Sequence, residues 1–184
     1  DFEGEIGSEW STNNVTVTPD GSNTFLGEFG SQAVSLNLRG FTGSNQLQFQ
    51  CELWIIRTWD GIAHNDRFTL NINGNTYLNE TFSNVNYQNQ SYPNGGSNPF
   101  QTGAFQVGGQ GYPDSPSHGT RAIYILNYEF EQSSSDLIVD FIVNLSSSIA
   151  DESWGIDNII ITSISEGEAW LEMPNAQLQI PPGE

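Results

Sequence analysis

Residues Gln46–Leu53 read QLQFQCEL, an unbroken alternation of polar and apolar side chains. Successive side chains of a β-strand point to opposite faces, so Leu47, Phe49, Cys51 and Leu53 share one face of this segment. The glutamines and Glu52 share the other face. The pattern predicts a strand with one buried and one solvated face, which is typical of antiparallel sheets.

The same period of two recurs along the chain, in four further segments: Val34–Leu38, Phe68–Ile72, Tyr124–Tyr128 and Leu137–Leu145. Repeated short strands with polar connections indicate an all-β fold, and we expect an antiparallel two-sheet sandwich of the jelly-roll kind. The run Ile159–Ile161 does not alternate, which predicts a central strand covered on both faces.

Turn residues separate these strands. Asn73-Gly74 predicts a hairpin after Phe68–Ile72, and Trp59-Asp60-Gly61 predicts a loop. The stretch from Ser83 to Thr120 is rich in Asn, Gln, Gly and Pro and shows little periodicity. We expect a long loop over the surface; its length is typical of functional or ligand-stabilised loops, with a floppy insertion as the alternative.

The chain of 184 residues fits one large core. We expect residues 1–164 to form the sandwich and residues 165–184 to form an extended tail or linker. Within this tail Asn175–Ile180 alternates polar and apolar residues, so it is a possible donor strand for an exposed sheet edge. Trp170, Leu178 and Ile180 are the expected assembly residues.

The charge is strongly acidic: 22 Asp and Glu face four arginines and no lysine, for a net charge of −18. Such a field repels nucleic acids and anionic membranes and attracts divalent cations, although a simply acidic soluble protein is the alternative. No apolar run approaches the about 18 residues of a membrane span.

Four N-x-S/T sequons favour a secreted or cell-surface glycoprotein, although a chain this rich in Asn, Ser and Thr also produces them by chance. Their asparagines are Asn14, Asn79, Asn89 and Asn144.

Nothing in the sequence has the pattern of an enzyme. Cys51 lies in a strand, and neither His64 nor His118 has a recognisable triad context. A pair of strand carboxylates, drawn from Glu52, Glu129 and Asp140, is the remaining catalytic alternative, but such side chains are ordinarily solvated. With two histidines and one cysteine, the chain is also a poor zinc protein. We expect a non-catalytic protein.

Calcium is the expected cofactor, because it takes six to eight oxygen ligands and the chain gathers carboxylates and amides in loops. Three segments carry these clusters: Trp59–Asp66, Asp151–Asn158 and Asp1–Glu5. Solvated acidic turns are the alternative for each segment taken alone.

The runs Glu152–Asn158 (ESWGIDN), Asp1–Gly4 (DFEG), Phe25–Gly30 (FLGEFG) and Trp59–Gly61 (WDG) carry a resemblance. Residues 1–164 resemble a module of large secreted bacterial proteins, similar to jelly-roll carbohydrate-binding and MAM-type domains. They also resemble calcium-dependent peptide-binding domains of long bacterial adhesins.

The resemblance implies a structural calcium held by an N-terminal F-E and a late W-x-I-D motif. By position it makes Glu3 and Asp157 the structural pair, and places Asp60, Asp66 and Glu152 at a neighbouring or shared site.

Two functions remain open. The first is a subunit of an extracellular filament or surface layer, in which the tail adds a strand to the next copy in a head-to-tail homopolymer. The alternative is a calcium-dependent adhesin module that binds carbohydrate or peptide. For that module Trp59, Tyr92 and Tyr112 are the expected ligand-binding rings, with core packing as the other possibility for an aromatic residue.

Overall fold

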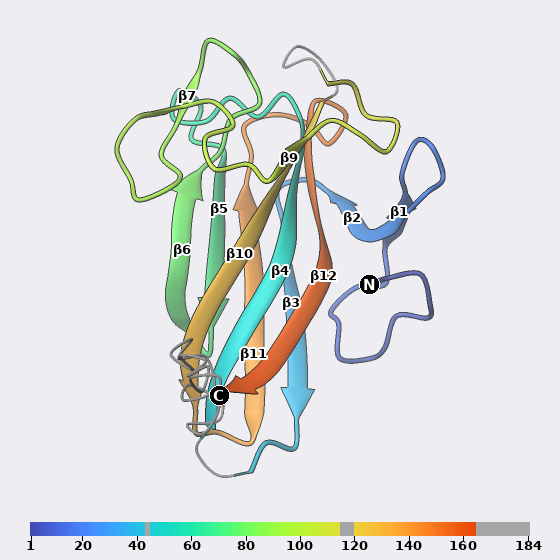
Figure 1. Ribbon diagram of the computed structural model, residues 1–184, viewed down its shortest axis with the longest axis vertical. Helices are drawn as coiled ribbons and strands as arrows, with labels where there is room; N and C mark the ends of the chain where they lie inside the picture. The colour runs from blue at the N-terminus through green and yellow to red at the C-terminus, as the bar shows by residue number, and fades with distance from the viewer. Residues whose placement is uncertain (43–44, 115–119, 165–184) are drawn as a thin grey trace, which may run out of the picture.

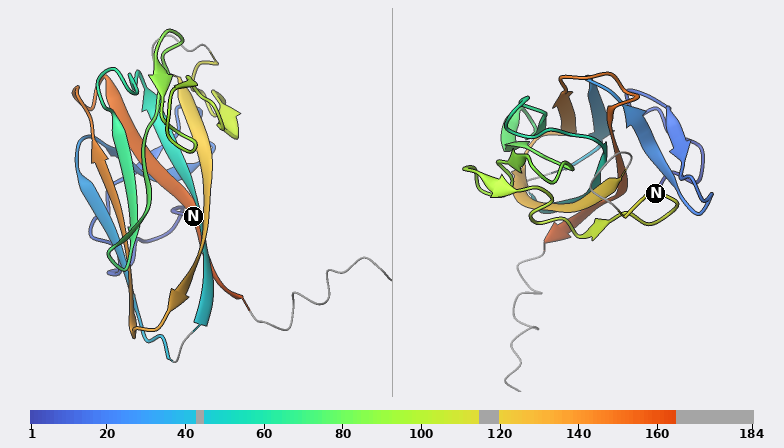
Figure 2. Two further views of the ribbon diagram at one scale, coloured as in Figure 1. Left: turned by 90° about the vertical axis from the view of Figure 1, so that its left-hand side faces the viewer. Right: turned by 90° about the horizontal axis from the view of Figure 1, so that it is seen from above.

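The computed structural model describes residues 1–42, 45–114 and 120–164 of the chain. They form an antiparallel sandwich whose two main sheets face each other as layers (Figures 1 and 2), as predicted. The first sheet has the order β1-β2-β12-β4-β10-β9 and the second the order β3-β11-β5-β6, while β7 and β8 pair separately. No described residue belongs to a helix that could cross a membrane.

The strands of the six-stranded sheet are β1 (Val15–Val17), β2 (Thr24–Phe29), β4 (Asn45–Arg57), β9 (Gln106–Val107), β10 (Arg121–Gln132) and β12 (Glu152–Ile164). Those of the four-stranded sheet are β3 (Ala33–Arg39), β5 (Arg67–Ile72), β6 (Asn75–Thr81) and β11 (Asp136–Asn144). The small pair consists of β7 (Asn89–Gln90) and β8 (Asn98–Pro99).

The alternating segment Gln46–Leu53 lies in β4, the centre of the larger sheet. β4 pairs with β10 along almost its whole length, from Ile56 to Asn45, and with β12 on its other side. Leu47, Phe49, Cys51 and Leu53 all face the core. The predicted strands of the second sheet and the Asn73-Gly74 hairpin are also confirmed, with both turn residues at positive φ.

Aromatic rings fill the space between the sheets. Phe141 of β11 stacks on Trp10 at 6.1 Å between ring centroids and packs against Phe49 and Phe68. Trp10 belongs to the N-terminal segment, so this segment covers part of the sandwich. Buried rings of this size contribute a large share of the hydrophobic stabilisation.

The predicted long loop follows β6 and is more ordered than a floppy insertion, because buried amides hold it together. The Gln90 side chain accepts hydrogen bonds from Ser83 N at 3.1 Å and Tyr124 Oη at 3.2 Å. The Asn84 amide donates to the carbonyl oxygens of Ile55 and Arg57 at the end of β4. The loop therefore packs over one end of the sandwich, here called the loop end.

The prediction for Ile159–Ile161 was right about the strand, since these residues lie in β12, but wrong about the cover on both faces. A bulge between Asp157 and Ile160 interrupts the pairing of β12 with β4, and Asn158 at the bulge has a φ of 49°. Beyond the bulge Ile160 is 49% exposed, whereas Ile159 and Ile161 pack against the core. The part of β12 that is covered on both faces is Glu152–Asp157.

We predict that Phe141→Ala lowers the free energy of unfolding by about 3–5 kcal/mol, because it leaves a cavity among packed rings. The matched control is Ile142→Ala on the same strand, whose side chain is exposed and whose loss costs about 0.5 kcal/mol or less. Urea denaturation measures both. Equal losses for the two variants would contradict the described facing of β11.

Candidate metal centre

Three carboxylates meet at the loop end, brought there by three segments. Asp60 follows β4, Asp66 immediately precedes β5, and Glu152 is the first residue of β12. One oxygen from each side chain lies within 4.8 Å of the others. Because β5 belongs to one sheet and β4 and β12 to the other, this carboxylate cluster joins the two layers.

The chain holds the loop before Asp66 in a tight turn. Trp59 is fully buried, and its Nε1 donates to Ser153 O at 2.8 Å, which ties the loop to β12. Gly61 has a φ of 65°, and a Cβ there would lie 2.2 Å from the carbonyl oxygen of Asn89. The turn therefore requires glycine and lies directly against the long loop.

Backbone amides orient two of the carboxylates. Asp60 N and Ser146 N donate to Asp66 at 2.5 and 3.1 Å, and Ser147 N donates to Glu152 at 2.9 Å. Asp66 and Glu152 are completely buried, and Asp60 is half-buried. Amide donors have no sequence signature, so the contribution of Ser146 and Ser147 was not predictable.

Positive charge is scarce around the cluster. Within the described ranges its single ion-pair partner is His64, whose Nδ1 lies 3.0 Å from Asp60 Oδ2, while Arg57 pairs with Glu28. Burial, followed by the charge of Asp66, raises the pKa of Glu152 to about 8. Burial also raises the pKa of Asp60, against the lowering effect of His64. The folded cluster therefore has to take up a proton or a cation.

Glu3 and Asp157, the pair implied by the resemblance, lie elsewhere, beside the start of β2. Glu3 Oε1 accepts a hydrogen bond from Thr24 N at 3.4 Å, and Asp157 Oδ2 accepts one from the Asn23 amide at 2.8 Å. Burial and then the charge of Glu52 raise the pKa of Asp157, whereas the two hydrogen bonds that it accepts lower it. In the described part of the chain, these residues do not join the carboxylate cluster.

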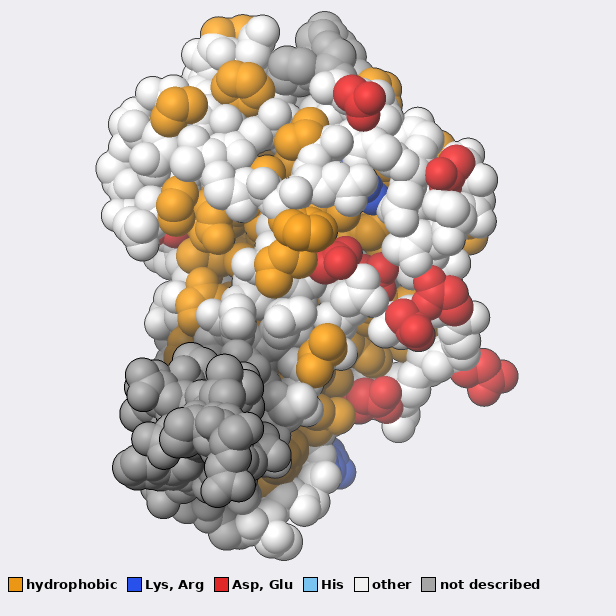
Figure 3. Space-filling view, viewed as in Figure 1, with side chains coloured by type: hydrophobic (Ala, Val, Ile, Leu, Met, Phe, Trp, Pro, Cys, Tyr) orange, Lys and Arg blue, Asp and Glu red, His pale blue; other side chains and the backbone are white. Residues whose placement is uncertain are grey.

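Acidic side chains gather on this same flank, around the N-terminal segment and the first two strands (Figure 3). Glu52 stands directly opposite Asp157 across the ladder between β4 and β12, and it accepts hydrogen bonds from Trp54 and Asn158. Glu52 and Asp157 are far apart in the sequence, and only the register of the two strands brings them together.

Two of the three expected ligand-binding rings need correction. Trp59 is buried with its N–H satisfied, so it has no free face for a sugar ring. Tyr112 is 9% exposed and closes a small outer core in which the guanidinium of Arg121 lies over Trp54 at 4.4 Å. Tyr92 is half-buried against Phe82 and stays a candidate.

The residues weighed for catalysis do not converge. Cys51 is fully buried, and burial raises the pKa of its thiol. Asp140 of β11 bonds Ser35 on the four-stranded sheet, whereas Glu52 and Glu129 lie on the other sheet. His118 lies outside the described residues.

Each sequon asparagine is exposed: Asn14, Asn79, Asn89 and Asn144. Glycosylation of these side chains stays a prediction. The assembly residues Trp170, Leu178 and Ile180, and with them the filament hypothesis, lie outside the described residues.

No family model matches the chain, and no curated protein matches it. Among solved structures it is similar to a sugar-binding protein described as the EclA C-terminal domain, with 13% identity over 82% of this chain and 91% of that chain and a TM-score of 0.35. It is also similar to a CBM35 from Cellvibrio japonicus Abf62, with 12% identity over 88% of this chain and 82% of that chain and a TM-score of 0.33. For Xyl-CBM35, in complex with a glucuronic acid containing disaccharide, the identity is 14% over 89% of this chain and 79% of that chain, and the TM-score is 0.31. Likeness at this level assigns neither a family nor a ligand to the chain.

We predict that, with a chelator present to remove metal ions, the free energy of unfolding falls as the pH rises from about 5 to 8. Glu152 has a pKa of about 8 in the folded chain against an ordinary 4.5, so the folded state holds the extra proton in this window and stability is lost as it leaves. Urea denaturation at several pH values measures the slope. Glu152→Gln is expected to flatten it and Glu129→Gln, on the exposed face of β10, to leave it unchanged.

Proposed function

We propose that this domain is a calcium-stabilised, non-catalytic binding module of an extracellular protein, with a carbohydrate or peptide bound at its loop end. The observation that carries the proposal is the buried cluster of Asp60, Asp66 and Glu152, which draws its ligands from both sheets. A cation there fastens the two layers and the long loop together.

Calcium fits the donors better than zinc does. Every side-chain donor is a carboxylate oxygen, and calcium accepts six to eight oxygens in flexible geometry. Zinc prefers sulfur and nitrogen, and in the described part of the chain one imidazole, His64, contacts the cluster. Extracellular modules bind calcium at about 0.1–1 mM, an affinity that a three-carboxylate cluster can reach.

Exposed apolar side chains near the cluster supply a contact surface. Tyr87 and Phe105 of the long loop are 79% and 70% exposed, and Ile62 of the Asp60–Asp66 turn is also exposed. Ile62 N donates to Asn89 O, so the turn and the loop form one surface. Hydrophobic side chains show on the upper part of the molecule in Figure 3, where the long loop lies. Rings beside amides suit both sugar faces and hydroxyl groups.

A second ion at Glu3 and Asp157 is part of the proposal. Both carboxylates flank Asn23 and Thr24, and Glu52 adds negative charge to Asp157. An ion there would fix the N-terminal segment to β2 and β12.

Saturating calcium is predicted to raise the melting temperature by about 5–10 °C. A ligand at a hundredfold its dissociation constant stabilises by about 2.7 kcal/mol, and each kcal/mol is worth about 2–4 °C in a domain of this size. Differential scanning calorimetry with calcium and with chelator measures the shift. Asp66→Asn and Glu152→Gln are expected to remove most of it, whereas Glu129→Gln is expected to keep it. An unshifted wild-type protein would refute the calcium assignment.

For the ligand, Tyr87→Ala and Phe105→Ala are predicted to weaken retention on a glycan or peptide array by about tenfold without changing the melting temperature, because both rings are exposed. The control is Ile138→Ala, an exposed residue on the outer face of the four-stranded sheet. Retention that needs calcium and falls for the loop variants supports the proposal. If neither Tyr87→Ala nor Phe105→Ala changes the retention, the ligand binds at another surface and the proposed contact surface is wrong.

A further inference from the structure

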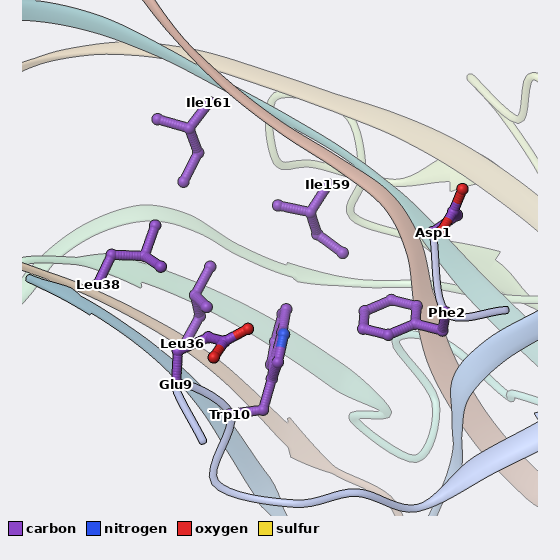
Figure 4. A pocket seen from close by; sticks show the side chains of 8 residues that line it. All are labelled: Asp1, Phe2, Glu9, Trp10, Leu36, Leu38, Ile159 and Ile161. Carbon is purple, nitrogen blue, oxygen red and sulfur yellow. The ribbon is translucent and has the colours of Figure 1, made fainter. Parts of the chain in front are cut away.

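An apolar groove runs along the open side of the sandwich, between β3 and the final part of β12. Two hollows of about 260 and 450 Å³ share Leu38 and Ile161 and so form one groove. Ile159 and Ile161 of β12 lie across from Leu36 and Leu38 of β3, with Phe2 and Trp10 at one end (Figure 4). Leu47 and Phe41 continue the lining toward the other end.

Within residues 1–42, 45–114 and 120–164, the β12 edge of this groove has no strand partner. β2 pairs with β12 through Trp154–Ile156, and the pairing of β12 with β4 on its other side continues to Ile164. Among the described residues, none forms a ladder with the outward edge of Ile159–Ile164. A row of unpaired backbone N–H and C=O groups beside an apolar groove is the arrangement that accepts an added strand.

On the other side of the groove, the edge of β3 is already covered by an extended segment of the same chain. The N-terminal segment bonds to β3, with Ser11 N donating to Ser35 O at 2.9 Å and Asn37 N donating to Glu9 O at 2.8 Å. This cover stops at Asn37, so the groove stays open beside Leu38 and Ile161.

We propose that Asn175–Ile180 of the same chain occupies this groove as a strand antiparallel to β12. The segment has six residues, as many as the open edge Ile159–Ile164. It alternates with the same period as β4, so Ala176, Leu178 and Ile180 enter the groove while the intervening Asn and Gln side chains face solvent. The added strand places Leu178 beside Ile161.

The connection favours pairing within one chain. β12 ends at Ile164 beside the groove, and residues 165–174 give a ten-residue return that is long enough for a hairpin. Such a short tether gives the segment an effective concentration of about 1 mM or more. A second copy competes only when the protein concentration approaches that value. The pairing needs neither cation nor glycan, so its failure would leave the proposed function intact.

Disulfide trapping in the full chain tests the register. In the double variant Ile161→Cys/Leu178→Cys, the two thiols stand directly opposite on one face, within disulfide reach. The matched control, Ile161→Cys/Gln177→Cys, turns the second thiol to the other face. Cys51 is buried and stays out of the reaction. Under mild oxidation at micromolar protein, we expect the first pair to close at least tenfold faster than the control, within monomers, on non-reducing gels.

Two results would overturn the proposal: equal closure rates for both pairs, or disulfide-linked dimers and larger species in place of closed monomers. The second result would assign the segment to a neighbouring copy and restore the filament hypothesis. Hydrogen exchange gives an independent readout. Leu178→Asp is expected to lower at least tenfold the protection of those Ile159–Ile164 amides that point away from β4 and to spare Glu152–Asp157, whereas Gln177→Asp leaves both unchanged. Protection that survives Leu178→Asp would also count against the added strand.

Discussion

Gathering three carboxylates in one place, two of them fully buried, is the constraint on which the loop end of this fold depends. Asp66 and Glu152 are removed from water beside Asp60, and the electrostatic cost of two or three negative charges at that distance is too large to leave uncompensated. A proton would offset part of this cost, and the proposed divalent cation would offset more of it. Since the side chains come from both sheets, whatever neutralises them also fastens the layers at the loop end.

On the open side of the sandwich the exposed groups are apolar and not charged, so the cost there is the exposure of hydrophobic side chains to water. The two sheets pack on each other around Phe141. The pairing of β2 with β12 ends at Ile156, and the hydrogen bonds of the N-terminal segment to β3 end at Asn37. Beyond the ends of these two pairings, Leu38 of β3 and Ile161 of β12 line a hollow. The sandwich therefore gathers negative charge at one end and leaves an apolar hollow open along one side.

The sequence predicted the strands that alternate polar and apolar residues and the three acidic residues that meet at the loop end, but it also placed Glu3 and Asp157 among the ligands, and these lie apart from the cluster. The period of two worked in β4 because one face is buried, and it failed at Ile159–Ile161 because the bulge at Asn158 changes which side chains face inward. Asp66 and Glu152 are far apart in the chain, and the sheet order alone makes them neighbours. Trp59 was expected to bind a ligand through its aromatic ring, yet the ring is fully buried and its N–H donates to Ser153 O.

The close approach of two loops connects the cluster with recognition. Gly61 lies so near the Asn89 carbonyl that a methyl group there would collide with it, and Ile62 N bonds the same oxygen. The long loop then returns to Asn84, whose amide is bonded to the end of β4. Any disorder in the Asp60–Asp66 turn would therefore loosen residues 84–89, which carry the exposed Tyr87. In the proposed binding module, neutralising the carboxylates would order this surface before a ligand arrives, and preorganisation of that kind lowers the entropic cost of binding.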